Sequence, residues 1–74
     1  MADKNFDILK GKWKQFEGDV QNEWGKLTDD QVAQVKGDVT KLIGLIQEQY
    51  GKSKSEAEEA VYRWQQKHEQ ELQG

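Results

Sequence analysis

The sequence predicts an all-α fold, a small bundle of about four helices built as two helical hairpins packed across each other. Apolar residues recur at helical spacing along most of the chain. Glycines followed by capping sequences divide this pattern into separate helices. The segment 37–62 also matches the segment 11–36 at an offset of 26 residues, which places Gly11, Gly18 and Gly25 on Gly37, Gly44 and Gly51. Such a repeat is typical of one helix–turn–helix unit used twice.

The first predicted helix carries an apolar stripe whose members lie three or four residues apart: Leu9, Trp13, Phe16, Val20 and Trp24. Gly25 is predicted to stop this helix, because glycine adopts the left-handed C-terminal conformation at low cost. The second helix is short and begins with a capping box, in which Thr28 and Gln31 each satisfy a free backbone N–H. It turns Val32 and Val35 inward.

The third predicted helix starts after a break near Gly37 and stops at Gly51. Its inward residues are Val39, Leu42, Ile43, Ile46 and Tyr50. Ser53 with Glu56 predicts another capping box at the start of the fourth helix. That helix turns Ala57, Ala60, Val61 and Trp64 inward. We expect one domain over residues 1–74, with an ordered core at 5–64. The apolar pattern is thin beyond Trp64, so we expect the tail at 65–74 to fray.

Gly11, Gly18 and Gly44 fall opposite the apolar stripes of their helices, at about 100° per residue. On an exposed helix face each costs roughly 1 kcal/mol relative to alanine. Neutral drift on a solvated face is the favoured explanation. The alternative is a fold kept marginally stable, able to loosen when water or ionic conditions change.

Composition limits the classes of function. The chain has 74 residues, no cysteine and a net charge of −3, with 34% apolar and 34% charged residues. It contains no apolar run of the roughly 20 residues that a membrane span needs. Residues 1–5 lack the apolar run of a signal peptide, so the cytoplasm is the expected location. No segment is strongly basic, which disfavours a nucleic-acid partner, and we expect a monomer.

No constellation for catalysis, cofactor binding or metal binding is present in the sequence. His68 is the single histidine and is interpreted as a residue at the edge of the solvent. Ser53 is better explained as a helix cap than as a nucleophile. Asp29 and Asp30 suit the first turn of a helix, where acidic groups complement the helix dipole. The sequence therefore predicts no catalytic, cofactor-binding or metal-binding residues.

The three tryptophans allow two interpretations. We expect Trp13 in the core, and Trp24 and Trp64 in the core or at its rim, because a lean fold needs its large rings inside. As candidates for a surface that binds a partner we name Trp24, Leu45 and Trp64, since tryptophan is enriched at interfaces and Leu45 lies off the apolar stripe of its helix. Lysines 10, 12 and 14 flank Trp13 and are interpreted as covering the core edge rather than as a site for nucleic acid.

The ordered segments Trp13–Gly18, Trp24–Asp30, Leu42–Gly51 and Ala57-Glu58 resemble the CsbD-like family of small bacterial stress proteins. The resemblance extends from about Asn5 to Trp64. It implies a small all-α fold and induction in the general stress response. It implies no established enzymatic activity and supplies no catalytic residues to carry over.

These considerations predict a non-enzymatic stress-response protein that acts as a helical interaction module for a protein partner. The alternative is a folded, hydrophilic protectant under osmotic or desiccation stress, in keeping with a mean hydropathy of −1.09. A nucleic-acid binder is the third hypothesis. An exposed apolar patch would favour the interaction module, and the absence of such a patch would favour the protectant. Binding to nucleic acid that depends steeply on salt would favour the nucleic-acid binder.

Overall fold

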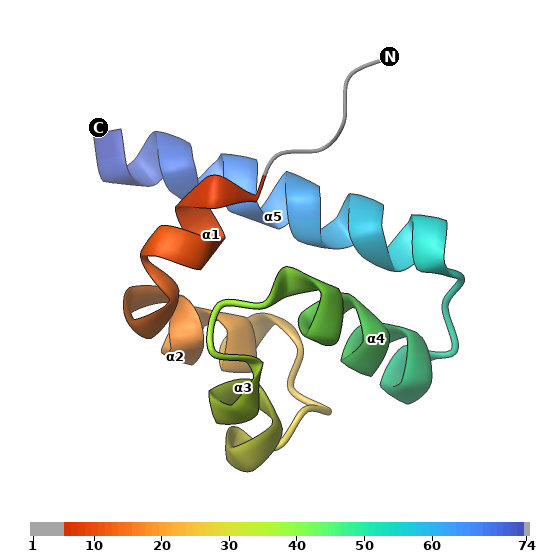
Figure 1. Ribbon diagram of the computed structural model, residues 1–74. Helices are drawn as coiled ribbons and strands as arrows, with labels where there is room; N and C mark the ends of the chain where they lie inside the picture. The colour runs from red at the N-terminus through yellow and green to blue at the C-terminus, as the bar shows by residue number, and fades with distance from the viewer. Residues whose placement is uncertain (1–5, 74) are drawn as a thin grey trace.

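The computed structural model describes residues 6–73, with side chains through His68. Five α-helices follow one another, as Figure 1 shows: α1 Asp7–Gly11, α2 Trp13–Glu23, α3 Asp29–Val35, α4 Val39–Tyr50 and α5 Lys54–Gln73. The described residues contain no strand, so the all-α prediction is confirmed. Residues 1–5, including the predicted start of the core at Asn5, lie outside the described residues, as does Gly74.

The prediction of about four helices is short by one, because the first predicted helix is divided in two. Lys12 has φ −122° and ψ 30°, which interrupts the helix between α1 and α2. Nearby, the chain passes close to Gly37, where an added Cβ would lie 3.2 Å from the carbonyl oxygen of Lys10. Gly37 also has φ +84°, a conformation that favours glycine.

Helix ends follow the capping sequences closely. The Gln31 N–H donates to Thr28 Oγ1 at 3.1 Å and the Thr28 N–H donates to Gln31 Oε1 at 3.0 Å, which confirms the predicted capping box. Before α5, the Ser53 N–H donates to Glu56 Oε1 at 3.0 Å and the Glu56 N–H donates to Ser53 Oγ at 3.2 Å. Both boxes satisfy backbone groups that the first turn of a helix leaves free.

Both predicted glycine stops coincide with helix ends, but only one has the predicted conformation. Gly51 closes α4 in the left-handed conformation, with φ +64°. Gly25 directly follows Trp24, the C-cap of α2, but it does not have the positive φ that was predicted for it. The break near Gly37 is confirmed, although Lys36 is the residue that caps α3 in the left-handed region.

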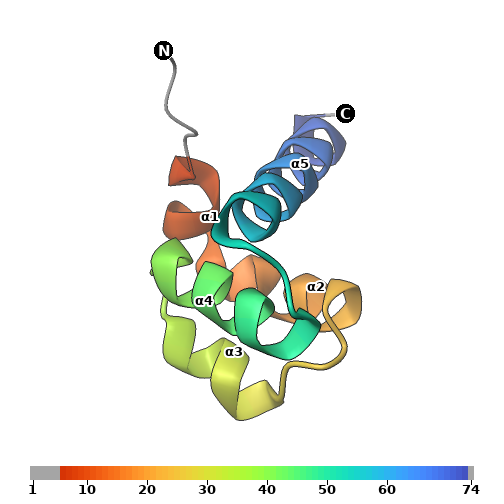
Figure 2. The same ribbon diagram turned by 90° about the vertical axis from the view of Figure 1, so that its right-hand side faces the viewer.

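The helices form a flat body with principal extents of 32, 31 and 17 Å. Helix α4 packs along α5, α2 packs against α3, and α3 also contacts α4. The short α1 contacts both α2 and α5, and Figure 1 shows it at the C-terminal half of α5. Figure 2 shows α3 on the side of α4 that faces away from α5. The description of these helices as two crossed hairpins stays a prediction.

The apolar stripes meet in one core. Its buried members are Leu9, Trp13, Phe16, Val20, Trp24, Leu27, Val32, Val35, Val39, Leu42, Ile43, Ile46, Ala57, Val61 and Trp64. Tyr50 and Ala60, which were expected inside, are partly buried against it. Within the described part of the chain, no helix is both long and apolar enough to span a membrane.

Helix α5 extends beyond Trp64, where fraying was expected to begin. Gln65 is 3% exposed, and its side-chain Oε1 accepts a hydrogen bond from the backbone N–H of Leu9 at 3.2 Å. This bond connects α1 to α5 across 56 positions of sequence. Because it satisfies a buried backbone donor, α5 has to continue at least through Gln65 for α1 to hold its place.

Candidate interaction surface

Two of the three residues proposed as surface anchors lie in the core. Trp24 and Trp64 are each 6% exposed, and their ring centroids are 5.5 Å apart. Phe16 packs edge-on against Trp64 at 5.5 Å. The expectation that Trp24 and Trp64 are exposed is therefore wrong, and the alternative that placed them in the core is correct. Their rings are needed between α2 and α5, where burial of aromatic area contributes most to stability.

His68 closes this aromatic cluster at the side of the solvent. Its ring centroid is 4.2 Å from that of Trp64 and 5.9 Å from that of Phe16. Its Nδ1 lies 3.9 Å from Oδ2 of Asp19 on α2. The side chain is 20% exposed, which agrees with the predicted position at the edge of the core. His68 therefore packs the later turns of α5 against α2.

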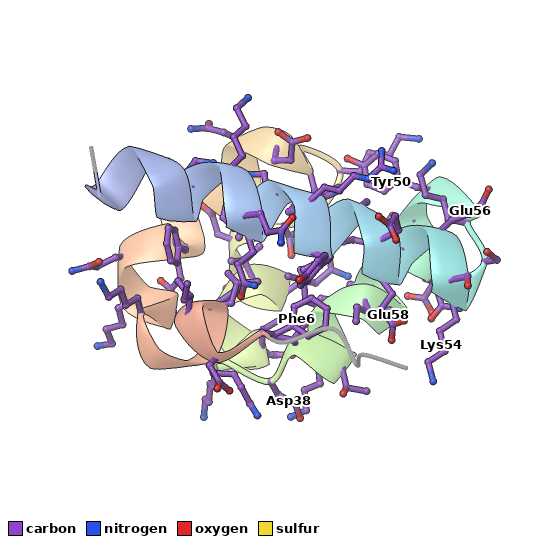
Figure 3. The ribbon with its side chains drawn as sticks, turned by 90° about the horizontal axis from the view of Figure 1, so that it is seen from above. Phe6, Asp38, Tyr50, Lys54, Glu56 and Glu58 are labelled. Atoms are coloured by element: carbon purple, nitrogen blue, oxygen red, sulfur yellow. The ribbon has the colours of Figure 1, made fainter. Side chains whose placement is uncertain are left out.

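The polar residues considered for chemistry serve as caps. The Ser53 hydroxyl accepts the Glu56 N–H, and the hydrogen bonds that Glu56 makes with Ser53 hold the pKa of the Glu56 carboxyl below its usual value. Asp29 and Asp30 occupy the first turn of α3. Figure 3 shows Glu56 in the first turn of α5, beside the end of α4. Among the described residues, no three potential ligands gather as a metal ion would require.

The lysines near Trp13 are exposed, whereas Trp13 itself is only 5% exposed. A buried ring cannot stack on a base, which is the contact that aromatic residues make in single-stranded nucleic-acid sites. The structure thus leaves lysines 10, 12 and 14 as solvent-facing charges around a core residue.

Leu45 is the remaining anchor candidate, and it is partly exposed. It lines a groove of about 470 Å³ between α3 and α4, whose lining residues are Gln31, Gln34, Val35, Lys41, Gly44, Leu45 and Glu48. The apolar contribution comes from Val35 and Leu45, and the other side chains are polar or charged. A Cβ added at Gly44 would meet no atom within 4 Å, so this part of the helix face is open.

Two charged residues of α4 border this groove, and neither has an ion-pair partner among the described residues. Lys41 and Glu48 are both exposed and lie two helical turns apart on α4. At about 100° per residue they point away from the core face of that helix, as does Gly44. Among residues 6–68, neither Lys41 nor Glu48 makes an ion pair.

A second groove, of about 610 Å³, lies between α2 and α3 and has a different lining. Its charged members are Glu17, Asp29 and Asp30, and its apolar members are Val32 and Ala33. The aspartates belong to the first turn of α3 and complement its dipole. The groove between α3 and α4 is therefore the better candidate for a docking surface, because it combines a larger apolar side chain with charges of both signs.

Sequence reasoning missed two tertiary contacts. The Tyr50 hydroxyl accepts the Lys26 N–H at 3.2 Å, and Lys26 Nζ lies 5.0 Å from the centre of the Tyr50 ring. No local pattern in the sequence connects these two residues, which lie 24 positions apart. The other contact is the bond from Leu9 to Gln65, and its signal was a polar residue next to Trp64 on the inward face of α5.

Comparisons with known proteins identify one family of small bacterial proteins. A family model described as CsbD-like matches residues 7–59. The UPF0337 protein YjbJ of Escherichia coli K12 is 46% identical over 65 residues, covering 88% of this chain and 94% of the relative. A UPF0337 protein of Bordetella pertussis is 49% identical over 57 residues, covering 77% of this chain and 86% of the relative. No solved structure matches the chain.

Proposed function

Because the chain belongs to the CsbD-like family, we propose that it is a non-enzymatic, cytoplasmic stress-response protein that binds a protein partner through the groove between α3 and α4. The observation that carries the proposal is the position of Leu45. This residue lies off the core stripe of α4 and is partly exposed in a groove whose remaining lining, apart from Val35 and Gly44, is polar or charged. An apolar anchor within a polar rim is the usual composition of a docking surface.

The proposal of a non-enzymatic role is supported by how the reactive side chains are used. Ser53 caps α5 with Glu56, and Asp29 lies in the first turn of α3. His68 packs in the aromatic cluster and contacts Asp19. Each group therefore has a structural role, whereas a catalytic group requires a neighbour that activates it and access to a substrate.

Site-specific photo-cross-linking tests the docking surface. A photoreactive amino acid replaces Gln34, at the groove, or Ser55, an exposed residue of α5, in cells under stress. We expect a discrete adduct from position 34 and none from position 55. The substitution Leu45→Gln, which removes the apolar anchor, should abolish the adduct while the helical circular dichroism of the purified protein is unchanged. Equal adducts from both positions, or an adduct insensitive to Leu45→Gln, would contradict the proposal.

A folded protectant is the second candidate function. It is favoured by the burial of nearly all large apolar side chains beneath a surface with many charges. A protectant works through its overall polar surface, so Leu45→Gln should not reduce protection of an enzyme that loses activity on drying. A loss of protection in this variant would exclude that mechanism. The net charge of −3 disfavours nucleic-acid binding. Only a measured affinity for nucleic acid that falls steeply with salt concentration would support that function.

A further inference from the structure

We propose that the partner at the groove between α3 and α4 is a second copy of this chain. In the proposed dimer the two α4 helices run antiparallel about a two-fold axis that passes between Gly44 and Leu45. This inference rests on the proposed function, since it names the occupant of the same groove. Closed two-fold dimers are the commonest form of homo-oligomer, and their interface has to be complementary to itself.

The charges on the groove meet this requirement. Lys41 lies three residues before Gly44, and Glu48 lies three residues after Leu45. An antiparallel two-fold axis between Gly44 and Leu45 therefore brings Lys41 of each copy opposite Glu48 of the other. Both side chains are exposed and make no ion pair with the described residues of their own chain, so both are available for this contact.

The shape of the helix face also complements itself. Because consecutive residues of a helix lie about 100° apart, the same axis brings the two Leu45 side chains together on one flank and the two Gly44 residues together on the other. The face is open at Gly44, where an added Cβ would meet nothing within 4 Å. Glycine allows close approach of another chain, although it weakens the interior of a helix. The paired glycines therefore allow the two helices to approach closely, and the two leucines can cover each other beside them.

The small size of the groove limits the affinity of the two copies for each other. One helix face and its flanking residues form a contact at the small end of protein interfaces, below about 1,200 Å², which is the range of weak and transient complexes. We therefore expect a monomer in dilute solution and a dimer at high local concentration.

Charge reversal tests the antiparallel arrangement by sedimentation equilibrium, over protein concentrations from about 10 µM to about 1 mM. Lys41→Glu and Glu48→Lys should each weaken self-association roughly tenfold, because each places like charges opposite one another at two symmetric contacts. An equimolar mixture of the two variants should associate as the wild type does, since every contact then joins opposite charges. A wild type that stays monomeric throughout, or a mixture as weak as either variant, would overturn the inference.

Substitutions of glycine test the shape argument. Gly44→Gln places a large side chain where the two helices approach most closely and should abolish self-association. Gly18→Gln is the matched control, because Gly18 is also exposed on a helix and has no atom within 4 Å of an added Cβ. It should leave the association constant unchanged. Equal effects of the two substitutions, with both variants helical by circular dichroism, would contradict a dimer built on Gly44.

Cross-linking at position 34 separates failure of this inference from failure of the proposed function. An adduct with twice the mass of the chain supports the dimer. An adduct with a different protein, together with a monomeric wild type, supports the proposed function and overturns the dimer. No adduct at position 34 and no association at high concentration would overturn both.

Discussion

The exposed glycines of α2 and α4 lower the stability of the fold, so replacing them should raise it. Neither Gly18 nor Gly44 has a positive φ, and a Cβ added at either would meet no atom within 4 Å. Alanine should therefore gain the full propensity difference of roughly 1 kcal/mol per site in a helix interior. The sites share no contacts, so Gly18→Ala/Gly44→Ala should add about 2 kcal/mol. In a domain of this size that corresponds to a rise in Tm of roughly 8–16 °C.

The assay is a set of urea and thermal denaturation curves followed by circular dichroism in dilute solution, where we expect the proposed dimer to dissociate. Gly37→Ala and Gly51→Ala are the opposite controls, because their φ values of +84° and +64° strain any residue with a side chain. At Gly37 the new Cβ would also lie 3.2 Å from the Lys10 carbonyl oxygen. Both should lower Tm. An unchanged or lower Tm in the double variant would refute the reasoning that these exposed glycines weaken the fold.

Three further substitutions test the core and the cap. Gln65→Leu should cost about 1–3 kcal/mol in urea denaturation, because it leaves the buried Leu9 N–H without its acceptor; a cost equal to that of the exposed control Gln66→Leu would contradict this. Trp64→Ala should cost about 3–5 kcal/mol, enough to remove the cooperative melt of so small a domain, and a cooperative melt near the wild-type Tm would refute it. Glu56→Gln should be less stable than the wild type at pH 7 and equal to it at strongly acidic pH. The folded pKa of Glu56 lies below its ordinary value of 4.5, so its stabilising effect is present above that value and is lost as pH falls through the lowered one; a constant difference between pH 7 and pH 3 would contradict this.

The features that follow from local rules could be predicted from the sequence. The box of Thr28 and Gln31 and that of Ser53 and Glu56 involve residues three positions apart, so the residue types alone specify them. The apolar stripes identified nearly the whole core for the same reason, since helical periodicity decides which face is buried.

The features that depend on distant parts of the chain could not be predicted. The interruption at Lys12 accompanies the close approach of Lys10 to Gly37. No local sequence pattern predicts this approach. Trp24 could equally have been an anchor or a core residue until α5 was placed beside α2 and Trp64 covered it. Leu45 could be assigned to the surface because its position on α4 depends on the helix alone, but the groove beside it also requires α3.

The bond from the Leu9 N–H to Gln65 also determines when this fold can be completed during synthesis. Ribosomes add about 5–20 residues per second, so several seconds separate the appearance of Leu9 from that of Gln65. The pair α2 and α3 can associate early, because their contacts are close in sequence. Helix α1 has to wait for α5 before its buried donor finds an acceptor. We therefore expect the nascent chain to present Leu9 and its neighbours to chaperones until translation has passed Gln65, and to be most open to proteolysis in that interval.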